Sequence, residues 1–319
     1  MTKILANDGI SQAGIDALTA KGFDIVTEHV PQDDLINTIK TENYEVLLVR
    51  SATTVRKDLI DACPHLKIVG RGGVGMDNID VEYAREKGIN VINTPAASSS
   101  SVAELVFAHL FGMVRFLFDS NRQMPMTGDA DFKGLKKSYA KGKELAGKTL
   151  GIIGFGRIGQ EVAKRAIGLG MNVMAHDKFI EEASITLDFF NGDKKSFTIE
   201  TESLEEVLKN ADFVTLHIPK IGDKPVIGAE QIGMMKTGAG IVNAARGGVI
   251  DETALMFALD KEKLAYAGLD VFDNEPNPSI HICMHNAISL TPHIGAATLE
   301  AQDRIGTELA DQIATHFNK

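Results

Sequence analysis

The stretch Gly154-Phe155-Gly156-Arg157-Ile158-Gly159 matches the dinucleotide-binding pattern G-x-G-x-x-G. The apolar segment Thr149–Ile153 precedes it, and a helix is predicted to begin at Arg157. The next apolar segment, Met171–His176, is followed by Asp177, roughly 20 residues beyond the glycines. A pyrophosphate-binding turn needs a strand before it, a helix after it and an acidic residue on the following strand. The stretch meets these requirements, so it predicts a nucleotide site in a βαβ unit.

A second match to the pattern, Gly70-Arg71-Gly72-Gly73-Val74-Gly75, follows the apolar segment Leu66–Val69. Its next apolar segment, Ile89–Ile92, ends in Asn93-Thr94-Pro95 and supplies no acidic residue. We therefore expect this second cluster to have a role other than nucleotide binding.

The residues of the first match have separate physical tasks. Gly154 would permit the tight turn, Gly156 would let the backbone approach the pyrophosphate, and Gly159 would let the helix pack against the strand. The backbone N–H groups of Arg157 and Ile158, at the positive end of the helix, would bind the phosphates.

The acidic residue indicates which dinucleotide binds. Asp177 would accept hydrogen bonds from the ribose hydroxyls of the adenosine. Its negative charge would repel a 2′-phosphate, so NAD is predicted rather than NADP. The neighbouring Lys178 weakens this preference.

The composition is that of an ordinary globular protein large enough for two domains. The chain has 319 residues, of which 44% are hydrophobic and 24% charged, and its formal net charge of -10 argues against a nucleic-acid partner. No apolar run approaches the roughly 18 residues that span a bilayer. Cys63 and Cys283 lie far apart, so a disulfide framework is not expected. The first residues, 1–6, do not have the pattern of a signal peptide, so a cytoplasmic location is predicted.

Short apolar segments alternate with predicted helices along the chain, which indicates βαβ units and parallel sheets. The predicted strands of the first set are Ile4–Ala6, Asp24–Thr27, Val46–Val49, Lys67–Val69 and Asn90–Ile92. Those of the second set are Leu150–Ile153, Asn172–His176, Phe213–His217, Gly240–Asn243, Ala267–Val271 and Ala287–Leu290. Between the sets, Ser101-Val102-Ala103-Glu104 fits a capping box and predicts a helix that begins at Ser101.

Three further segments carry local signals. Ile185–Phe190 and Lys195–Thr201 flank Asn191-Gly192, which fits either an inserted hairpin or a polar loop. The capping patterns at Ser203 and Asp251 predict helix starts. The segment Leu299–Phe317 is predicted to be an amphipathic helix.

Three later motifs each follow a predicted strand: Asn243-Ala244-Ala245-Arg246-Gly247-Gly248, Leu269–Pro276 and Thr291-Pro292-His293-Ile294-Gly295-Ala296. Together with Gly154–Gly159 they make the whole chain resemble the D-2-hydroxyacid dehydrogenase family. The resemblance implies an α/β fold of two doubly wound parallel-sheet domains, in which a Rossmann NAD-binding domain (98–296) is inserted into a flavodoxin-like substrate domain (1–97 with 297–319).

The resemblance also implies three catalytic residues. His293 would remove the hydroxyl proton of a 2-hydroxy acid, because histidine side chains ordinarily titrate near neutral pH. Glu275 would orient the imidazole and stabilise its protonated form, with Asp273 as the rival for this role. Arg246 would bind the carboxylate or the C2 oxygen, which suits its planar guanidinium.

Further cofactor contacts follow from the family pattern, with Asp270 binding the carboxamide. They are expected at Val74, Ile218, Ala244, Ala245, Arg246, Asp270, His293, Gly295 and Ala296.

In this family the loop after the fourth strand holds the substrate carboxylate, which implies that role for the N–H groups of Gly73, Val74 and Gly75. Two further side chains, Arg50 and Arg71, with Ser51 beside the first, resemble the phosphate cradle of the phosphoglycerate-oxidising members. Surface salt bridges are the alternative explanation of this arginine pair.

The resemblance implies that the substrate is 3-phospho-D-glycerate, a phosphorylated hydroxy acid. A glyoxylate or hydroxypyruvate reductase is the alternative within the family, and an NAD-sensing corepressor-like binding protein is the alternative outside enzymes. No appended regulatory domain is expected after Leu299–Phe317.

Two features concern partners. The apolar segment Val102–Phe118 is either buried core or an interface, and the family implies a homodimer through the NAD domain. His281-Ile282-Cys283-Met284-His285 contains metal-ligand residue types that would share a face on a strand, but it has no fourth ligand nearby. No metal, nucleic-acid or membrane partner is therefore predicted.

Overall fold

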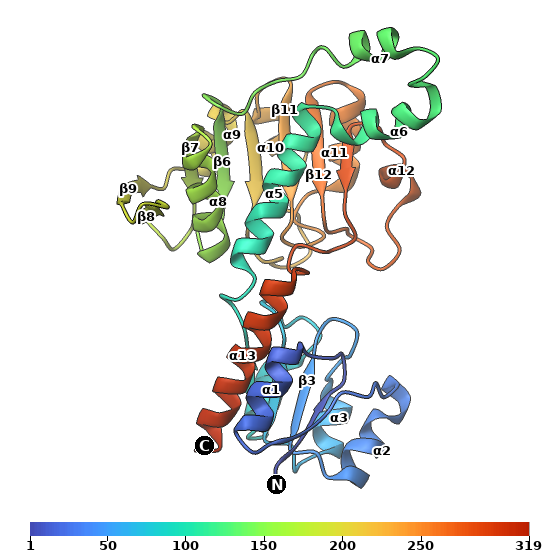
Figure 1. Ribbon diagram of the computed structural model, residues 1–319, viewed down its shortest axis with the longest axis vertical. Helices are drawn as coiled ribbons and strands as arrows, with labels where there is room; N and C mark the ends of the chain where they lie inside the picture. Colours follow the sequence, from blue (N-terminus) through green and yellow to red (C-terminus); the bar gives the residue numbers. More distant parts are fainter. Residues whose placement is uncertain (319) are drawn as a thin grey trace. The chain divides into compact units, whose positions relative to one another are not determined.

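The computed structural model describes residues 1–318 and divides into two compact units (Figure 1). Unit 1 contains Met1–Ser101 with Ala296–Lys319, and unit 2 contains Val102–Gly295. The sequence interpretation placed the crossings at 97/98 and 296/297, which differ from these boundaries by a few residues. Both units are α/β structures built on parallel sheets.

Unit 1 has a five-stranded parallel sheet with the order β2-β1-β3-β4-β5, which is the flavodoxin-like order. Its strands are β1 (Lys3–Ala6), β2 (Asp24–Val26), β3 (Val46–Val49), β4 (Ile68–Arg71) and β5 (Asn90–Asn93). Its helices are α1 (Gln12–Ala20), α2 (Gln32–Glu42), α3 (Lys57–Ala62), α4 (Val81–Glu86) and α13 (Leu299–His316).

Both faces of this sheet are buried, because successive strand residues point to opposite sides. Ile4 and Val46 pack in a cluster with α1 and α13, whereas Leu5 and Leu47 pack in another cluster with α2, α3 and α4. Helices α1 and α13 approach most closely at a glycine, since a Cβ on Gly14 would lie 2.8 Å from the Cα of Gly306.

Unit 2 has a six-stranded parallel sheet with the order β13-β12-β11-β10-β6-β7. Its strands are β6 (Thr149–Ile153), β7 (Asn172–His176), β10 (Phe213–Leu216), β11 (Ala239–Asn243), β12 (Leu264–Leu269) and β13 (Ile288–Leu290). Its helices are α5 (Ser99–Val114), which begins in unit 1, α6 (Leu117–Thr127), α7 (Phe132–Ser138), α8 (Arg157–Gly168), α9 (Leu204–Asn210), α10 (Ala229–Met234), α11 (Glu252–Asp260) and α12 (Ile280–Cys283).

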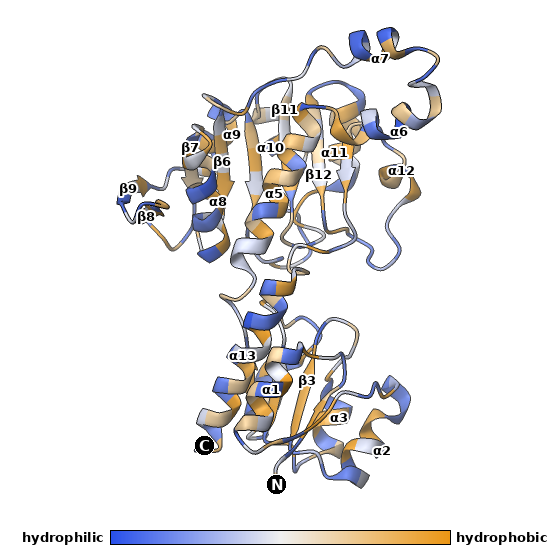
Figure 2. Cartoon of the chain, viewed as in Figure 1, coloured by the Kyte–Doolittle hydropathy of each residue, from blue (hydrophilic) through white to orange (hydrophobic). Residues whose placement is uncertain are grey.

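The helices again cover both faces of the sheet. Helices α5 and α8 pack on one face, and α9, α10 and α11 pack on the other. Figure 2 shows many apolar residues in the strands of both sheets, while much of the α8 ribbon has the colour of hydrophilic residues. This is the doubly wound Rossmann-type arrangement that the family resemblance implied.

A hairpin lies near the β7 edge of this sheet. Strands β8 (Glu182–Asp188) and β9 (Lys194–Glu200) pair antiparallel, and Gly192 adopts a φ of 89° in the connecting turn. The hairpin alternative for the segments flanking Asn191-Gly192 is therefore confirmed. Immediately after β9, Thr201 forms an isolated parallel bridge with Ala175 of β7, which extends the sheet beyond β7 by one residue pair among residues 1–318.

The remaining strand predictions are confirmed to within a few residues, but the predicted helix start at Ser101 is wrong. Helix α5 begins at Ser99, because a turn through the preceding residues 95–98 leads directly into it. The Ser101 hydroxyl instead lies 2.8 Å from the hydroxyl of Thr298, and Glu104 forms an ion pair with Arg165 at 3.0 Å. The helix therefore starts without the predicted capping box.

The long apolar segment Val102–Phe118 is not one helix. It breaks after Val114, where Phe116 has a φ of 54°, and α6 follows in a different direction. Among residues 1–318, no single helix is long and apolar enough to span a membrane, and α5 with α6 meets that test only as a pair bent by 55°.

The segment His281–His285 is not the strand on which its ligand-type residues would share a face. It forms the short helix α12 and the turn after it. Within the described part of the chain, no group of three or more His, Cys, Asp or Glu side chains is arranged to hold a metal ion.

Candidate active site

The glycine turn joins β6 to α8. Gly154 has a φ of 95°, and a Cβ there would lie 2.4 Å from the carbonyl oxygen of His217. A Cβ on Gly159 would lie 2.1 Å from the carbonyl oxygen of Gly154, so the protein itself requires glycine at both positions. Gly156 differs, because nothing lies within 4 Å of a Cβ built there. The open space beside Gly156 and the N-terminus of α8 together fit a pyrophosphate.

Asp177 follows β7 and is hydrogen-bonded to the same turn. Its Oδ2 accepts a bond from the N–H of Phe155 at 2.7 Å, and its Oδ1 accepts bonds from the N–H groups of Phe179 at 2.9 Å and Ile180 at 3.2 Å. Partial burial raises the pKa of this carboxyl, but the hydrogen bonds from Phe179, Phe155 and Ile180 outweigh that effect and lower it. The carboxylate is therefore ionised, with acceptor capacity left on Oδ2 for a ribose hydroxyl.

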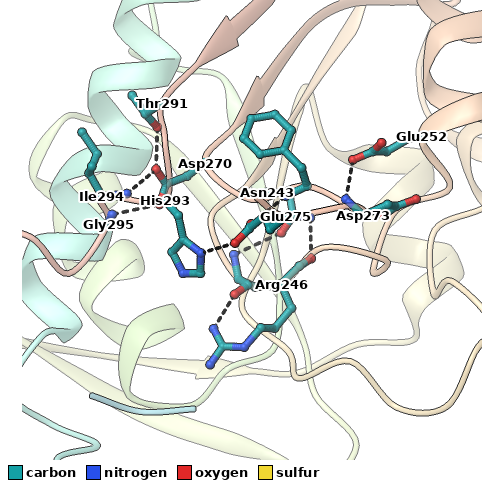
Figure 3. Close-up of polar contacts among 12 residues, drawn as sticks. Asn243, Arg246, Glu252, Asp270, Asp273, Glu275, Thr291, His293, Ile294 and Gly295 are labelled. Atoms are coloured by element: carbon teal, nitrogen blue, oxygen red, sulfur yellow. Dashed lines mark hydrogen bonds and ion pairs between the residues drawn. The ribbon is translucent and has the colours of Figure 1, made fainter. Parts of the chain in front are cut away.

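His293 and Glu275 form a direct pair in unit 2 (Figure 3). The Nδ1 of His293 lies 2.7 Å from Oε2 of Glu275, whose Oε1 accepts a bond from the N–H of Phe272 at 2.9 Å. An ionised carboxylate only accepts hydrogen bonds, so the Nδ1 of the neutral ring carries the proton. The other ring nitrogen, Nε2, is then able to take a proton from a ligand.

The backbone that presents His293 is strained. His293 has a φ of 56°, in the left-handed region that costs an L-residue roughly 1–2 kcal/mol. The carboxylate of Asp270, which is 1% exposed, holds the following residues by accepting bonds from the N–H groups of Ile294 and Gly295, both at 2.8 Å. The hydroxyl of Thr291 donates a third bond to Asp270 at 2.6 Å. Asp270, expected to bind the carboxamide, thus also anchors the His293 loop.

Arg246 lies in the loop after β11, and Asn243 shapes that loop. The Nδ2 of Asn243 donates to the carbonyl of Arg246 at 2.9 Å, while its Oδ1 accepts from the N–H of Ala245 at 3.1 Å. The Nη1 of Arg246 donates to the carbonyl of Ala245 at 2.6 Å (Figure 3). A Cβ on Gly247 would lie 1.8 Å from the carbonyl oxygen of Phe272, so the Arg246 loop packs backbone against backbone on the loop that leads to Glu275.

Asp273, the rival for the acidic role, makes different contacts. Its Oδ1 accepts a bond from the N–H of Gly248 at 2.5 Å, and its own N–H donates to Oε1 of Glu252 at 2.8 Å. Glu275, and not Asp273, contacts His293. Burial raises the pKa of Glu252, and the neighbouring Asp273 and Glu275 carboxylates add to that shift, although the N–H of Asp273 opposes it.

Arg50 and Arg71 flank a glycine turn in unit 1. Arg71 is the last residue of β4 and pairs with Val49, the last residue of β3. Arg50 is the residue directly after β3, so the two arginines lie at the ends of neighbouring strands. The Nη1 of Arg71 donates to the carbonyl of Gly72 at 2.6 Å and would lie 2.6 Å from a Cβ on Gly73. The Cγ of Arg50 would lie 3.6 Å from a Cβ on Gly72. The guanidinium of Arg50 has no ion pair or hydrogen bond within residues 1–318.

The expected carboxylate site in this turn is only partly available. Gly73 has a φ of 147°, which only glycine readily adopts, and its N–H donates to the carbonyl of Arg71 at 2.9 Å. Within the described chain, the N–H groups of Val74 and Gly75 make no hydrogen bond. Ser51, predicted beside Arg50, is exposed.

Apart from Val74 and Ala296, which belong to unit 1, the other residues expected at the cofactor follow the carboxyl ends of neighbouring strands in unit 2, where ligands bind in open α/β sheets. Ile218 follows β10, and its Cγ2 would lie 2.7 Å from a Cβ on Gly154. Ala244 and Ala245 follow β11 and are buried. Gly295 ends unit 2, whereas Ala296 falls in unit 1.

Three residues that contact the loops of the site were not singled out from the sequence: Asn243, Glu252 and Thr291. Asn243 and Thr291 belong to motifs that follow predicted strands, so their positions in the sequence could have indicated a role in the site. Glu252 is the first residue of α11, between Asp251 and Thr253, and nothing local indicated a role for it beyond the helix start.

Known proteins resemble this chain along its whole length. The family profile described as "D-isomer specific 2-hydroxyacid dehydrogenase, NAD binding domain" matches residues 107–295. A hydroxypyruvate reductase of Thermotoga maritima is 41% identical over 318 residues, which cover 98% of this chain and 97% of the relative. A D-3-phosphoglycerate dehydrogenase of Methanocaldococcus jannaschii is 42% identical over 98% of this chain but only 57% of its own length. The chain thus spans about half the length of such phosphoglycerate dehydrogenases.

Solved structures agree on the architecture. The NAD⁺-bound 3-phosphoglycerate dehydrogenase of Entamoeba histolytica has a TM-score of 0.77 at 28% identity, covering 100% of this chain and 96% of that one. A glyoxylate reductase from Paecilomyes thermophila has a TM-score of 0.80 at 28% identity, with the same coverage of 100% and 96%.

Proposed function

Since the chain belongs to the D-isomer specific 2-hydroxyacid dehydrogenase family, it is an NAD-dependent dehydrogenase of D-2-hydroxy acids, and we propose that its substrate is 3-phospho-D-glycerate. The product would be 3-phosphohydroxypyruvate, a step towards serine. NAD bound at Gly154–Gly159 and Asp177 would accept the hydride that leaves C2.

The protein's own groups handle the proton and the charge. The Nε2 of His293 would take the proton of the C2 hydroxyl during oxidation, while Glu275 holds the ring and stabilises the imidazolium. Arg246 would bind the C2 oxygen or the carboxylate, where a guanidinium stabilises developing negative charge. In the reverse direction the same imidazolium returns the proton.

The observation that carries the choice of substrate is the pair of guanidinium groups beside the Gly72–Gly73 turn. Within residues 1–318 the guanidinium of Arg50 makes no hydrogen bond or ion pair, and Arg71 lies on the adjacent strand end. Two such groups suit a phosphate, which accepts paired hydrogen bonds. The free N–H groups of Val74 and Gly75 in the same turn would bind the substrate carboxylate.

Reduction of hydroxypyruvate or glyoxylate is the second candidate. The alignment with the hydroxypyruvate reductase of Thermotoga maritima covers nearly the full length of both proteins. In addition, the Nη1 of Arg71 already bonds to the Gly72 carbonyl, so a phosphate would have to compete with that contact. Hydroxypyruvate differs from the proposed product only by the phosphate, which makes the two candidates separable.

Steady-state kinetics with 3-phosphoglycerate and NAD⁺, and with phosphohydroxypyruvate, hydroxypyruvate and glyoxylate with NADH, test the proposal. We expect the phosphorylated pair to have the highest kcat/KM. Arg50→Gln should raise the KM of phosphohydroxypyruvate about tenfold, the loss of roughly 1.4 kcal/mol, without raising that of glyoxylate. Arg56→Gln is the matched control, because the guanidinium of Arg56 bonds to Asp80 and the Asp77 carbonyl. Turnover of glyoxylate without turnover of phosphohydroxypyruvate would contradict the substrate.

Unit 2 also carries the proposed dimer interface. Large apolar side chains are exposed on α6 and at the adjoining end of α5, and α6 projects from the body of unit 2 in Figure 1. They include Phe111, Leu117, Met124 and Met126, which are 42%, 63%, 46% and 73% exposed. Exposure of these apolar side chains to water is unfavourable, so we expect a homodimer. Leu117→Lys should dissociate it into monomers, and light scattering measures the molecular mass of each form.

A further inference from the structure

A chain of buried hydrogen bonds lies behind the His293 loop. His109, in the middle of α5, is 2% exposed. Its Nδ1 lies 2.8 Å from the hydroxyl of Ser289 in β13, and its Nε2 lies 3.1 Å from the hydroxyl of Thr291. The Thr291 hydroxyl in turn lies 2.6 Å from Oδ1 of Asp270, whose carboxylate anchors the loop.

The position of each proton follows from what each group is able to donate. The carboxylate of Asp270 accepts, so the single hydroxyl proton of Thr291 is directed to it. The Thr291 oxygen can then only accept from His109, which places the imidazole proton on Nε2. The Nδ1 of His109 is left to accept from the hydroxyl of Ser289. When His109 is neutral, its two ring nitrogens and the hydroxyl groups of Ser289 and Thr291 all have hydrogen-bond partners.

Two independent features fit a neutral and fixed His109. Burial lowers the pKa of its imidazole, although the charge of Asp270 opposes that shift. The side chain also sits directly over β12, because a Cβ on Gly268 would lie 2.9 Å from the Cβ of His109. The ring is therefore confined between Gly268 and the two hydroxyl groups.

We infer that His109, acting through Thr291 and Asp270, is a positioning residue that holds the His293 loop in its left-handed conformation. The inference rests on the proposed role of His293 in proton transfer. Asp270 is the link, since the same carboxylate accepts from Thr291 and from the N–H groups of Ile294 and Gly295. If Thr291 no longer donates, the Asp270 carboxylate is free to rotate away from those N–H groups, and His293 loses its fixed orientation.

Paired substitutions separate positioning from packing. Thr291→Val keeps the shape but loses the hydroxyl, and we expect kcat to fall about 10- to 100-fold, the effect of a catalytic group misplaced by about 1 Å. Thr291→Ser keeps the hydroxyl and should restore most of the wild-type kcat. Likewise His109→Leu should lower kcat, whereas His109→Gln, whose amide N–H is able to donate to Thr291, should lower it much less.

Nitrogen-15 NMR of the histidine side chains in the full-length wild type gives a readout that does not depend on turnover. We expect His109 as the neutral Nε2–H tautomer. An Nδ1–H tautomer, an imidazolium at neutral pH, or a Thr291→Val enzyme with wild-type kcat would each overturn the inference. Thr291→Val and Thr291→Ser variants with equal losses of kcat would also overturn it, because packing alone would then explain the effect. If the wild type turned over no 2-hydroxy or 2-oxo acid, the proposed function would fail. The tautomer of His109 would still show whether the proposed hydrogen bonds to Thr291 and Ser289 exist.

Discussion

The Oδ2 of Asp177 accepts a hydrogen bond from the backbone N–H of Phe155, 2.7 Å away, inside the glycine turn. This bond joins the end of β7 to the turn between β6 and α8. The carboxylate expected to contact the ribose therefore also holds the turn expected to bind the pyrophosphate, so a substitution at Asp177 affects both.

Asp177→Asn should lower the preference for NAD over NADP. The amide has no negative charge to repel a 2′-phosphate, and its Nδ2 cannot accept from Phe155. We expect weaker NAD binding and a fall of about tenfold, roughly 1.4 kcal/mol, in the ratio of the NADP KM to the NAD KM. Asp193→Asn, the same charge change on the exposed β8–β9 turn, is the control. A wild type that already used both cofactors equally would contradict the argument.

The glycine turn offers a test that separates cofactor binding from folding. Gly156 has an ordinary φ of -71°, and a Cβ there meets no protein atom within 4 Å. Gly156→Ala should therefore leave the melting temperature unchanged but weaken NAD binding at least about tenfold, or 1.4 kcal/mol, since the methyl would occupy the space of the pyrophosphate. Titration calorimetry with NAD and thermal unfolding measure both quantities.

Gly168→Ala is the matched control, because Gly168 lies at the other end of α8 with equally open space. It should bind NAD like the wild type. Gly159→Ala should instead destabilise the protein by about 1–3 kcal/mol, as its Cβ would overlap the Gly154 carbonyl. Equal NAD affinity in the Gly156→Ala and Gly168→Ala variants would place the pyrophosphate elsewhere.

The strand positions and this turn were predictable because their signals are local, whereas the two fold types were implied by the family resemblance. Apolar segments such as Val46–Val49 are short and continuous, as expected for strands buried on both faces. The φ of 95° at Gly154 and the contact of Gly159 with the Gly154 carbonyl lie within one βαβ unit, although Gly154 also faces the His217 carbonyl beyond β10. The motifs around Arg246 and His293 follow directly after strands, so recognising the strands placed both residues at the same sheet edge.

What the sequence could not predict depends on contacts between distant residues. The start of α5 was misplaced because Ser101 pairs with Thr298, 197 residues away, and does not cap the helix. His109 was treated as part of an apolar helix, since its partner Ser289 lies 180 residues further on. The anchoring of the loop by Asp270 was likewise missed, because the sequence indicated only one role for that carboxylate.

Glu275→Gln and Asp273→Asn remove the same charge from neighbouring positions and distinguish the two candidate acids. Glu275 contacts His293, whereas Asp273 bonds to the N–H of Gly248. We expect Glu275→Gln to lower kcat about 10²- to 10⁴-fold, the range for impaired general acid–base catalysis. Asp273→Asn keeps an acceptor oxygen for Gly248 and should have a much smaller effect. A larger loss of kcat in Asp273→Asn would reverse the assignment.

Stability should fall in mild acid because of two histidines in unit 2, the buried His109 and the partly buried His217. Burial lowers the pKa of His217 to about 3 and also lowers that of His109. Unfolding exposes both rings, which then bind protons below their ordinary pKa of about 6.5. Between that value and the lowered values the unfolded state binds more protons than the folded state, so the free energy of unfolding decreases as pH falls.

Each of these two histidines contributes up to about 1.4 kcal/mol per pH unit in this window. Urea unfolding of the wild type between pH 7 and about pH 5, above the range where carboxylates titrate, measures the combined slope. His217→Gln removes one titrating ring and should reduce the slope by up to about 1.4 kcal/mol per pH unit. His65→Gln, at a partly buried position in unit 1 where Nε2 lies 3.3 Å from the Ile39 carbonyl oxygen, is the matched substitution in the other unit. A slope in His217→Gln equal to that of the wild type would show that the His217 ring already binds a proton in the folded state.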